Sequence, residues 1–546
     1  MALAKSLAVS LLGLTATPIE VEADISSQLP NFVLVGLPDA SLSESTARVR
    51  AAITNSGMPW PPRRITVNLS PASVPKQGSA FDLSIALAIL AASGAATSGS
   101  VAKCLHIGEL GLDGSVRPVP GVLPMVKAAR DLGVATVMVP LDCVAEARLI
   151  SGVNVVGVCS LREAVAWHAG LLAVELAPGD GVVLEGEAGV EGEAVRREFA
   201  VAGVAGSGLT GFGVPDISEV VGQELAVRAL IVAAAGGHHL LMVGSPGAGK
   251  TMLAERLPGL LPDLSAEAAL ESAAVASVVG RSVFDHNGTN LNLRPHLEAP
   301  HHSASMSAVV GGGLRHPRPG AISLAHNGVL FLDEAAEFQT PVLDSLRQPL
   351  EAGEIRLHRA AGTAVFPARF QLVLAANPCP CGKALTKSGC LCSVVARARY
   401  GQKLSGPLLD RVDIRLTIQP VSALAQRVIQ EQANDLGLAS APIDSATARA
   451  QIVEARQAAA VRLVDTPWIL NSQVAASHLK GALKLPSGAT KKLDAELLRS
   501  RVSMRGYIRC LRLAWTICDL VGHTSPTADD VALALELRGA DNPLAV

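Results

Sequence analysis

Residues 244–251 read Gly-Ser-Pro-Gly-Ala-Gly-Lys-Thr and match the phosphate-binding pattern GxxxxGK[ST] at every fixed position. Glycine at three positions removes the Cβ atoms that would keep backbone N–H groups away from phosphate oxygens. The lysine supplies a positive charge for the outer phosphates, and the threonine hydroxyl is a suitable Mg²⁺ ligand. The residues expected to surround a bound nucleotide are Gly244, Ser245, Pro246, Gly247, Ala248, Gly249, Lys250 and Thr251.

The sequence on either side supports this interpretation. Residues 239–243 form an apolar run typical of a buried parallel strand, and residues 252–257 read as the start of a helix. A phosphate group between them would meet the helix N-terminus, where unpaired N–H groups and the helix dipole favour an anion. The sequence therefore predicts binding of ATP or GTP.

Two later strands supply groups for hydrolysis. Residues 328–332 form an apolar strand that ends in Asp333 and Glu334. A carboxylate at a strand tip can hold Mg²⁺, and the next one can orient and deprotonate the attacking water, so we assign these roles to the two residues in that order. A third strand, residues 370–374, leads into Asn377, whose amide could polarise the same water. The competing interpretation of Asn377 is a turn residue before the proline that follows it.

The composition indicates a multidomain protein without a single-sign charge field. A chain of 546 residues is long enough for about two to four domains. Its net charge of −2 gives no argument for a nucleic-acid partner. No apolar stretch reaches the roughly 18–20 residues of a membrane span. Residues 7–14 imitate a signal peptide, but the nucleotide motifs and nine cysteines without a small-domain framework favour a cytoplasmic protein.

The order of these patterns divides the chain into four segments. Residues 1–172 alternate short Val- and Ile-rich strands with Ala-rich helices, the pattern of an α/β or α+β domain. Residues 173–212 are rich in Gly, Ala, Val and Glu, and we expect an acidic linker that leaves the flanking domains free to move. Residues 213–420 carry the nucleotide motifs, and residues 421–546 contain helical patterns. The predicted fold class is α/β.

Several longer strings resemble one known family, the Mg-chelatase-like AAA+ ATPases of the ComM/YifB type, over nearly the whole chain. Besides the phosphate loop, the strings that carry the resemblance are Asp-Ile-Ser-Glu-Val-Val-Gly-Gln at 216–223, Ala-Pro-His-His-Ser-Ala-Ser at 299–305, Val-Val-Gly-Gly-Gly at 309–313, Phe-Pro-Ala-Arg-Phe at 366–370, Asn-Pro-Cys-Pro-Cys-Gly at 377–382 and Ser-Gly-Pro-Leu-Leu-Asp-Arg-Val-Asp at 405–413. One departure is Glu298, at a position where related sequences carry a basic residue.

The resemblance implies a P-loop AAA+ parallel-sheet core with a helical C-terminal lid, preceded by a Lon-protease-like α+β domain. It also implies a homo-oligomer, a hexameric ring that binds ATP and Mg²⁺ between subunits. Arg411 matches the arginine finger that acts on a neighbour's nucleotide, and Arg505 matches sensor 2 at the start of a lid helix. A fixed guanidinium would neutralise charge that develops on the transferred phosphoryl group. The competing interpretation of both arginines is a surface salt bridge.

Local charge gives a direct clue to what such a motor acts on. Residues 345–420 hold eleven Lys or Arg against four Asp or Glu. Within them, residues 354–359 and 363–366 read as a hairpin around Gly362, and in a ring this hairpin would point at the pore, where cations can follow a phosphate backbone. The residues assigned to DNA contact are Arg356, His358 and Arg359 of this hairpin, with Arg315 and Arg318 of the loop at 311–320. The competing interpretation is a hairpin whose charges are only solvated.

The resemblance leaves two substrate classes open. ComM-type relatives are DNA motors that promote branch migration during recombination of incoming DNA, which implies helicase or translocase activity on single-stranded or branched DNA and recombination proteins as partners. Related chelatase subunits drive metal insertion into a porphyrin instead. A chelatase-type or protein-remodelling ATPase without a DNA substrate is therefore the alternative.

Four cysteines stand in the spacing C-x-C-x8-C-x-C: Cys379, Cys381, Cys390 and Cys392. Four thiolates brought together by a short loop match a tetrahedral zinc site, although C-x-C is tighter than the usual C-x2-C spacing. A reduced or oxidisable cysteine loop is the alternative. The other five cysteines stand alone in apolar stretches, and we assign them to the core.

Proteolysis is a third function class, raised by the Lon-like resemblance. The positions that match the catalytic serine and lysine of that family are Ala80 and Leu123. Ser79 is one residue away from the nucleophile position, and no lysine replaces the missing base. We therefore expect an N-terminal domain without the catalytic dyad.

Overall fold

The computed structural model describes most of the chain, in segments separated by gaps. The described residues are 2–36, 40–76, 78–171, 215–285, 288, 290–313, 317–359, 362–385, 389–404, 406–420 and 443–539. The expected linker at 173–212 and Arg315 lie outside them. No helix within these segments is long and apolar enough to cross a membrane.

The N-terminal domain is built on a seven-stranded sheet in the order β3-β4-β2-β1-β5-β8-β9. Its longest strands, β1 (Ala2–Leu12) and β2 (Thr15–Ser26), form an antiparallel hairpin that turns at Gly13 and Leu14. The other strands of this domain are β3 (Asn31–Val35), β4 (Arg64–Ser70), β5 (Cys104–His106), β6 (Glu109–Leu110), β7 (Val116–Arg117), β8 (Thr136–Pro140) and β9 (Asn154–Val158).

Helices complete this domain, and the helix α2 (Asp82–Ala92) lies at its centre. Every residue of α2 is buried, which fits a sequence of Leu, Ile and Ala at nearly every position. The remaining helices are α1 (Ala40–Asn55), α3 (Ser98–Val101), α4 (Val122–Asp131), α5 (Val144–Ala147) and α6 (Leu161–His168). The domain is therefore a mixed α/β structure, as predicted.

The nucleotide domain is built on a five-stranded parallel sheet in the order β11-β14-β17-β10-β18. These strands are β10 (Leu240–Gly244), β11 (Leu297–Glu298), β14 (Val329–Leu332), β17 (Gln371–Ala376) and β18 (Ile414–Ile418). Every residue of β10, β14 and β17 is buried, and alternate residues of β10 belong to two different apolar clusters. Such continuous apolar strands form because both faces of a parallel sheet are covered.

Helices and two small hairpins surround this sheet. The helices are α7 (Glu224–Gly236), α8 (Lys250–Leu260), α9 (Ala266–Val278), α10 (Met306–Val309), α11 (Ala321–Leu324), α12 (Thr340–Ser345), α13 (Arg347–Ala352), α14 (Val394–Lys403) and α15 (Gly406–Leu409). One hairpin pairs β12 (Gly311–Gly312) with β13 (Arg318–Pro319), and the other pairs β15 (Glu354–Arg359) with β16 (Gly362–Pro367). The second confirms the hairpin expected around Gly362.

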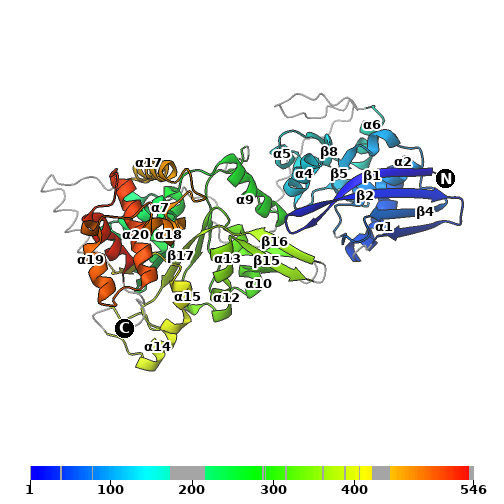
Figure 1. Ribbon diagram of the computed structural model, residues 1–546. Helices are drawn as coiled ribbons and strands as arrows, with labels where there is room; N and C mark the ends of the chain where they lie inside the picture. The colour runs from blue at the N-terminus through cyan, green and yellow to red at the C-terminus, as the bar shows by residue number, and fades with distance from the viewer. Residues whose placement is uncertain are drawn as a thin grey trace.

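The C-terminal part is helical and packs on the nucleotide domain (Figure 1). Its helices are α17 (Ser445–Arg462), α18 (Ala476–Lys480), α19 (Ser487–Leu498), α20 (Met504–Val521) and α21 (Ala528–Arg538). Ser503 begins α20, because its hydroxyl accepts a hydrogen bond from the N–H of Gly506. Apolar residues of α17, α20 and α21 share one core cluster with β10 and α7.

The N-terminal domain is packed against the nucleotide domain, which differs from the free movement expected from the linker composition. In Figure 1, α4 lies beside α9. The Gly121 N–H donates to the Ser277 carbonyl oxygen at 3.0 Å, and Val122 and Val126 share an apolar cluster with Ala273. Apolar burial of this kind stabilises a fixed arrangement whatever the composition of the connecting segment.

Candidate nucleotide-binding site

The phosphate loop lies between the buried strand β10 and the N-terminus of α8. Gly247 and Gly249 have φ angles of 76° and 86°, a left-handed conformation that residues with a Cβ rarely adopt. A Cβ on Gly244 would lie 2.5 Å from the carbonyl oxygen of Ile418, so this position also requires glycine. The Ser245 hydroxyl is buried and has no hydrogen-bond partner within the described residues. A buried polar group of this kind is available to a bound ligand, which fits a nucleotide site.

Lys250, the first residue of α8, is held across the loop. Its amine donates to the carbonyl oxygens of Gly244 (2.7 Å) and Ser245 (3.0 Å) and to Oδ1 of Asn377 (3.2 Å). Burial lowers the pKa of Lys250, whereas two nearby carboxylates act in the opposite direction. The structure thus brings Lys250 and Asn377, predicted from motifs far apart in the sequence, into direct contact.

The two expected Mg²⁺ ligands are also adjacent. The Thr251 hydroxyl donates to Oδ2 of Asp333 at 2.7 Å. A hydroxyl and a carboxylate oxygen are hard donors of the type that Mg²⁺ takes beside nucleotide phosphates. Thr251 and Asp333 would hold Mg²⁺ there, and the ion would neutralise negative charge on the nucleotide phosphates. The side chains present therefore fit the metal.

Glu334 follows β14 in an unusual backbone conformation. Its φ angle is 49°, in the left-handed region that non-glycine residues seldom occupy. Its N–H donates to Oδ1 of Asp333 at 2.8 Å, and its half-exposed carboxylate lies 3.0 Å from Nδ1 of His302. A strained residue at a strand tip is typical of functional sites. The carboxylate is held by His302 and is accessible to water.

Two residues at the site were missed by sequence reasoning. His302 belongs to the string at 299–305, which we used only for the family resemblance and not for a role. Gln223 donates from Nε2 to the Ala248 carbonyl oxygen at 2.7 Å, and its Oε1 atom has no partner within the described segments. Both residues lie in strings shared with the family, and only this resemblance could have indicated from the sequence that they belong to the site.

The two catalytic arginines expected from the resemblance lie outside the phosphate loop. Arg411 is mostly buried, donates to the Pro407 carbonyl oxygen at 2.5 Å and forms an ion pair with Glu351. Burial lowers its pKa, and three neighbouring arginines act in the same direction. Arg505, at the first turn of α20, is 76% exposed and pairs with Asp410. Their ion-pair partners, Glu351 and Asp410, both lie outside the phosphate loop.

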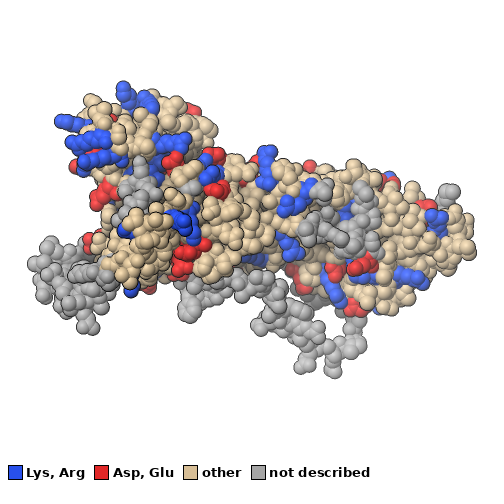
Figure 2. Space-filling model, turned by 90° about the horizontal axis from the view of Figure 1, so that it is seen from below, with Lys and Arg blue, Asp and Glu red and all other residues tan. Residues whose placement is uncertain are grey.

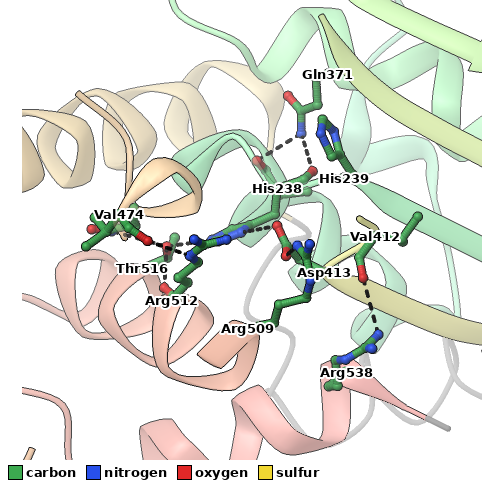
Figure 3. A network of polar contacts seen from close by, with 12 residues as sticks. His238, His239, Gln371, Val412, Asp413, Val474, Arg509, Arg512, Thr516 and Arg538 are labelled. Atoms are coloured by element: carbon green, nitrogen blue, oxygen red, sulfur yellow. Dashed lines mark hydrogen bonds and ion pairs between the residues drawn. The ribbon is translucent and has the colours of Figure 1, made fainter. Parts of the chain in front are cut away.

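A buried polar network joins the sheet to the C-terminal helices (Figure 3). Asp413 accepts a hydrogen bond from Nδ1 of His238 at 3.0 Å and forms an ion pair with Arg509 of α20. Burial alone would raise the pKa of Asp413, but Arg509 and His238 hold it well below its usual range. His238 also contacts the Thr516 hydroxyl through Nε2 at 2.8 Å. The network links the segment after Arg411 to the helix that carries Arg505.

The four clustered cysteines lie together in the loop after β17. The Cys379 sulfur is 3.3 Å from Cys381 and 3.4 Å from Cys390, and the sulfurs of Cys381 and Cys390 are 3.6 Å apart. Cys392 completes the group. These separations are longer than the roughly 2.05 Å of a disulfide and close to the about 3.8 Å edge of a tetrahedral zinc–sulfur site. A Cβ on Gly382 would lie 2.6 Å from Cδ of Pro246, so this loop abuts the phosphate loop.

A second group of metal-ligand type is satisfied by its own hydrogen bonds. His106 and His168 face each other through their Nε2 atoms at 2.9 Å, beside Cys104. Their Nδ1 atoms contact the hydroxyls of Ser6 (2.8 Å) and Ser100 (2.9 Å). Burial lowers the pKa of both imidazoles, to about 4 for His168. Neutral imidazoles with every ring nitrogen paired form a structural core network, in agreement with the core assignment of Cys104. Cys143, Cys510 and Cys518 are also buried, but Cys159 is exposed, so its assignment to the core was wrong.

The basic hairpin β15–β16 has two distinct faces. Ile355, Leu357, Ala364 and Phe366 are buried in one apolar cluster. On the other face, Arg356 pairs with Glu354 at 2.6 Å, and the His358 ring contacts the Thr363 hydroxyl at 2.9 Å. Arg359, near the turn, donates to the Gly313 carbonyl oxygen at 3.1 Å, close to β13 with its exposed Arg318. The structure therefore brings the described DNA-contact candidates onto neighbouring hairpins.

Exposed cations also gather on the C-terminal helices, which the sequence reasoning missed. Figure 2 shows Lys and Arg side chains at the end of the molecule that carries these helices. The exposed cations of this stretch are Lys480, Lys484, Lys491, Lys492, Arg499, Arg501 and Arg505. The acids between them are engaged, because Asp494 accepts a hydrogen bond from the Tyr507 hydroxyl at 2.7 Å and Glu496 pairs with Arg499 at 3.1 Å.

Glu298, where this chain departs from related sequences, lies in β11 of the nucleotide domain and forms an ion pair with Arg281.

The N-terminal domain shows no arrangement that favours proteolysis at the matched positions. Ala80 and Leu123 occupy them, and Leu123 is buried in α4. The Ser79 hydroxyl donates to Glu109, and the Lys76 amine donates to the Pro71 carbonyl oxygen. The position that matches the lysine base holds Leu123, and the Ser79 hydroxyl, one residue from the nucleophile position, is paired with Glu109.

Comparison with known proteins places the chain among relatives that share its full length. Residues 216–426 match the family model "Magnesium chelatase, subunit ChlI", residues 21–142 match "Subunit ChlI of Mg-chelatase", and residues 442–538 match "Magnesium chelatase, subunit ChlI C-terminal". An uncharacterized protein of Mycobacterium tuberculosis is 45% identical over 540 residues, which cover 98% of this chain and 99% of that protein.

Two further full-length relatives have individual names. YifB of Escherichia coli, an uncharacterized protein, is 38% identical over 98% of this chain and 96% of its own length. Competence protein ComM of Haemophilus influenzae is 38% identical over 96% of both chains. A shorter match, 28% over 145 residues, is to Lon protease 2 of Bacillus subtilis and agrees with the Lon-like fold of the N-terminal part. The chain therefore belongs to the Mg-chelatase-like AAA+ ATPases of the ComM/YifB type.

Proposed function

We propose that this AAA+ ATPase is a hexameric ring motor that acts on single-stranded or branched DNA and promotes branch migration or unwinding during recombination. The observation that carries the DNA part is the basic hairpin β15–β16, which presents Arg356 and His358 on its exposed face and the exposed Arg359 beside its turn. The full-length similarity to a competence protein supports the same direction. Recombination proteins are the partners that such a motor would meet.

The proximity of these side chains within one subunit supports their proposed roles in ATP hydrolysis. Lys250 would bind the outer phosphates, and Thr251 and Asp333 would hold Mg²⁺. Glu334 would take a proton from the attacking water, and Asn377, fixed by Lys250 at 3.2 Å, would orient that water. His302 holds the Glu334 carboxylate at 3.0 Å and would set its direction before catalysis.

The positions of the two arginines support the proposed ring. Arg411 and Arg505 have partners outside the phosphate loop of their own chain, Glu351 and Asp410 respectively. A guanidinium that is not held at its own phosphate loop is available to a neighbour's site, and a repeated head-to-tail interface forms a ring when the rotation between subunits closes. Arg411 would then act as the finger and Arg505 as sensor 2.

The proposed DNA contact is sequence-independent. Arginines on a hairpin can neutralise phosphates without reaching base edges, so binding should weaken as counterions compete at higher salt. Because the inner face of β15–β16 is buried, exposed arginines can be replaced without disturbing the packing of the hairpin. This allows a direct test of the assignment.

The test is fluorescence anisotropy with single-stranded, duplex and four-way-junction DNA at two salt concentrations, in the presence of an ATP analogue. The double variant Arg356→Ala/Arg359→Ala should bind less tightly, with a salt slope smaller by about 2. A matched control is Arg63→Ala/Arg148→Ala, which removes two exposed arginines of the N-terminal domain. Absence of DNA binding by the unaltered protein at low salt would favour the chelatase-type or protein-remodelling alternative.

The cysteine cluster is proposed to hold zinc. The four sulfurs lie within 4.8 Å of one another without a disulfide, and the tetrahedral edge is only slightly longer than the separations among Cys379, Cys381 and Cys390. Zinc would stabilise the loop that begins at Cys379, two residues after Asn377, and that abuts the phosphate loop. The alternative is a reduced cysteine loop without metal. Metal analysis of the purified protein distinguishes the two.

A further inference from the structure

The N-terminal domain touches the basic hairpin through the turn between its two longest strands. In Figure 1 the β1–β2 hairpin extends from its own sheet toward β15–β16. A Cβ placed on Gly13 would lie 3.1 Å from Cβ of Ala364, and one placed on Gly362 would lie 3.0 Å from Cδ2 of Leu12. Gly13 has a φ angle of 66°, so this turn needs glycine for its backbone as well as for close approach.

Apolar side chains extend this contact into the core of the nucleotide domain. Leu12 and Leu14 pack against the apolar cluster that contains Leu357, Ala364 and Phe366, the inner-face residues of the hairpin. These two leucines belong to a different domain from the cluster that they cover. The β1–β2 turn therefore covers the apolar inner face of the basic hairpin at the end where β15 and β16 are connected.

We propose that the β1–β2 turn, residues Leu12, Gly13 and Leu14, is a positioning element that fixes the basic hairpin and thereby gives the N-terminal domain a role in the response to DNA. A two-stranded hairpin is marginally stable alone and keeps its order only when one face is packed. The proximal end of β15–β16 continues into α13 and β17. Its distal end, at Arg359 and Gly362, is the part that Leu12 contacts.

The positioning is reinforced by the second contact between the two domains. The Gly121 N–H donates to the Ser277 carbonyl oxygen at 3.0 Å, and the Leu123 N–H lies 3.4 Å from the Ser277 hydroxyl. Together with the turn, this contact holds the N-terminal domain at two separate places on the nucleotide domain. A rigid domain attached at two places can hold the hairpin at a defined angle, and this would set how Arg356 and His358 face a bound strand.

The DNA part of this inference rests on the proposed function, whereas the positioning part does not. The test uses the full-length variant Leu12→Asp, which places a charge in the apolar contact. Leu3→Asp is the control, because Leu3 lies on the same strand, is 60% exposed and is far from the turn in register. Leu12→Met keeps the apolar contact and should restore the unaltered behaviour. Leu12→Ala serves if the charged variant fails to fold.

Hydrogen–deuterium exchange of residues 354–367 measures the positioning directly and needs no DNA. We expect exchange there to be about tenfold faster in Leu12→Asp than in Leu3→Asp, because local opening costs less without the contact. Unchanged exchange in both Leu12→Asp and Leu12→Ala would overturn the proposal.

DNA binding and ATP turnover then test the functional consequence. In Leu12→Asp we expect the Kd for single-stranded DNA to rise and DNA stimulation of turnover to fall, with kcat and KM for ATP without DNA unchanged. If DNA stimulates ATP turnover equally in the unaltered protein and in Leu12→Asp, the proposal is overturned. An unaltered protein that does not respond to DNA would contradict the proposed function, and the exchange result alone would then decide on the positioning.

Discussion

The Thr251 hydroxyl donates a 2.7 Å hydrogen bond to Oδ2 of Asp333, which joins the first turn of α8 to the tip of β14. The parallel sheet produces this contact, because β10 and β14 both end at its carboxyl edge with β17 between them. The same edge brings Lys250 against Asn377 and leaves the Glu334 carboxylate half exposed. The side chains predicted to bind and hydrolyse the nucleotide thus converge at one edge of the sheet.

Lys250→Ala and Glu334→Gln should both abolish turnover, with different signatures. Loss of the Lys250 ammonium removes a contact with the outer phosphates, so nucleotide affinity should fall. Loss of the Glu334 carboxylate removes the base alone, so affinity should be kept while kcat falls by about 10²–10⁴-fold. Fluorescent-nucleotide binding and steady-state ATPase rates separate the two. Normal turnover in Glu334→Gln would show that another group activates the water.

Arg411→Ala should lose turnover by about 10³-fold or more while keeping its own phosphate loop intact. If Arg411 acts on the neighbouring subunit, rings that mix Arg411→Ala with Lys250→Ala subunits should recover activity. In such rings, Arg411 of a Lys250→Ala subunit can act on the intact phosphate loop of an Arg411→Ala neighbour. Random mixing at equal amounts should restore about one quarter of the unaltered rate. ATPase assays of co-expressed, differently tagged variants measure this. Inactive mixed rings would mean that Arg411 acts within its own subunit or is structural.

Asp413→Asn should destabilise the protein by about 3–5 kcal/mol at neutral pH, because Arg509 would lose its buried partner. The folded-state pKa of Asp413 is held below its usual value, so its contribution is present above the unfolded pKa of about 3.9 and is lost as pH falls. The melting temperature of the variant should therefore drop less on acidification than that of the unaltered protein. Asp142→Asn, at an exposed position, is the control. Equal melting temperatures at pH 7 would contradict the structural role.

The phosphate loop, the strand-tip residues and the basic hairpin could all be predicted from the sequence. Each depends on local patterns: glycine spacing at 244–249, an apolar strand followed by Asp333 and Glu334, and a turn at Gly362 between alternating residues. The topology of a parallel sheet then places strand-tip residues side by side. The convergence of the four cysteines could also be predicted, because a short loop connects them.

Contacts between distant surfaces could not be predicted in this way. Leu12 and Leu14 look like ordinary strand residues, and nothing in their spacing indicates that they cover a core in another domain. His238 and Asp413 are 175 residues apart and meet only because β10 and β18 are neighbours. The linker composition suggested free domains, whereas apolar surfaces on α4 and α9 decide their arrangement.

Purified protein should contain about one zinc per chain, bound by the four cysteines. Cys379→Ser should lose the metal and destabilise the loop next to the phosphate loop, because three thiolates bind zinc less well than four. Cys159→Ser, at an exposed cysteine outside the cluster, should retain it. Elemental analysis together with thermal melting measures both. No zinc in the unaltered protein, with Cys379→Ser equally stable, would contradict the site.

The rate of ATP hydrolysis with and without DNA decides whether this AAA+ ATPase works as a DNA motor. For a DNA motor, single-stranded or four-way-junction DNA should raise turnover at low salt, and this increase should fall steeply as salt rises. Arg356→Ala/Arg359→Ala should lose the increase while keeping the rate without DNA. A turnover rate that is the same with and without every DNA tested would show that the protein is not a DNA motor.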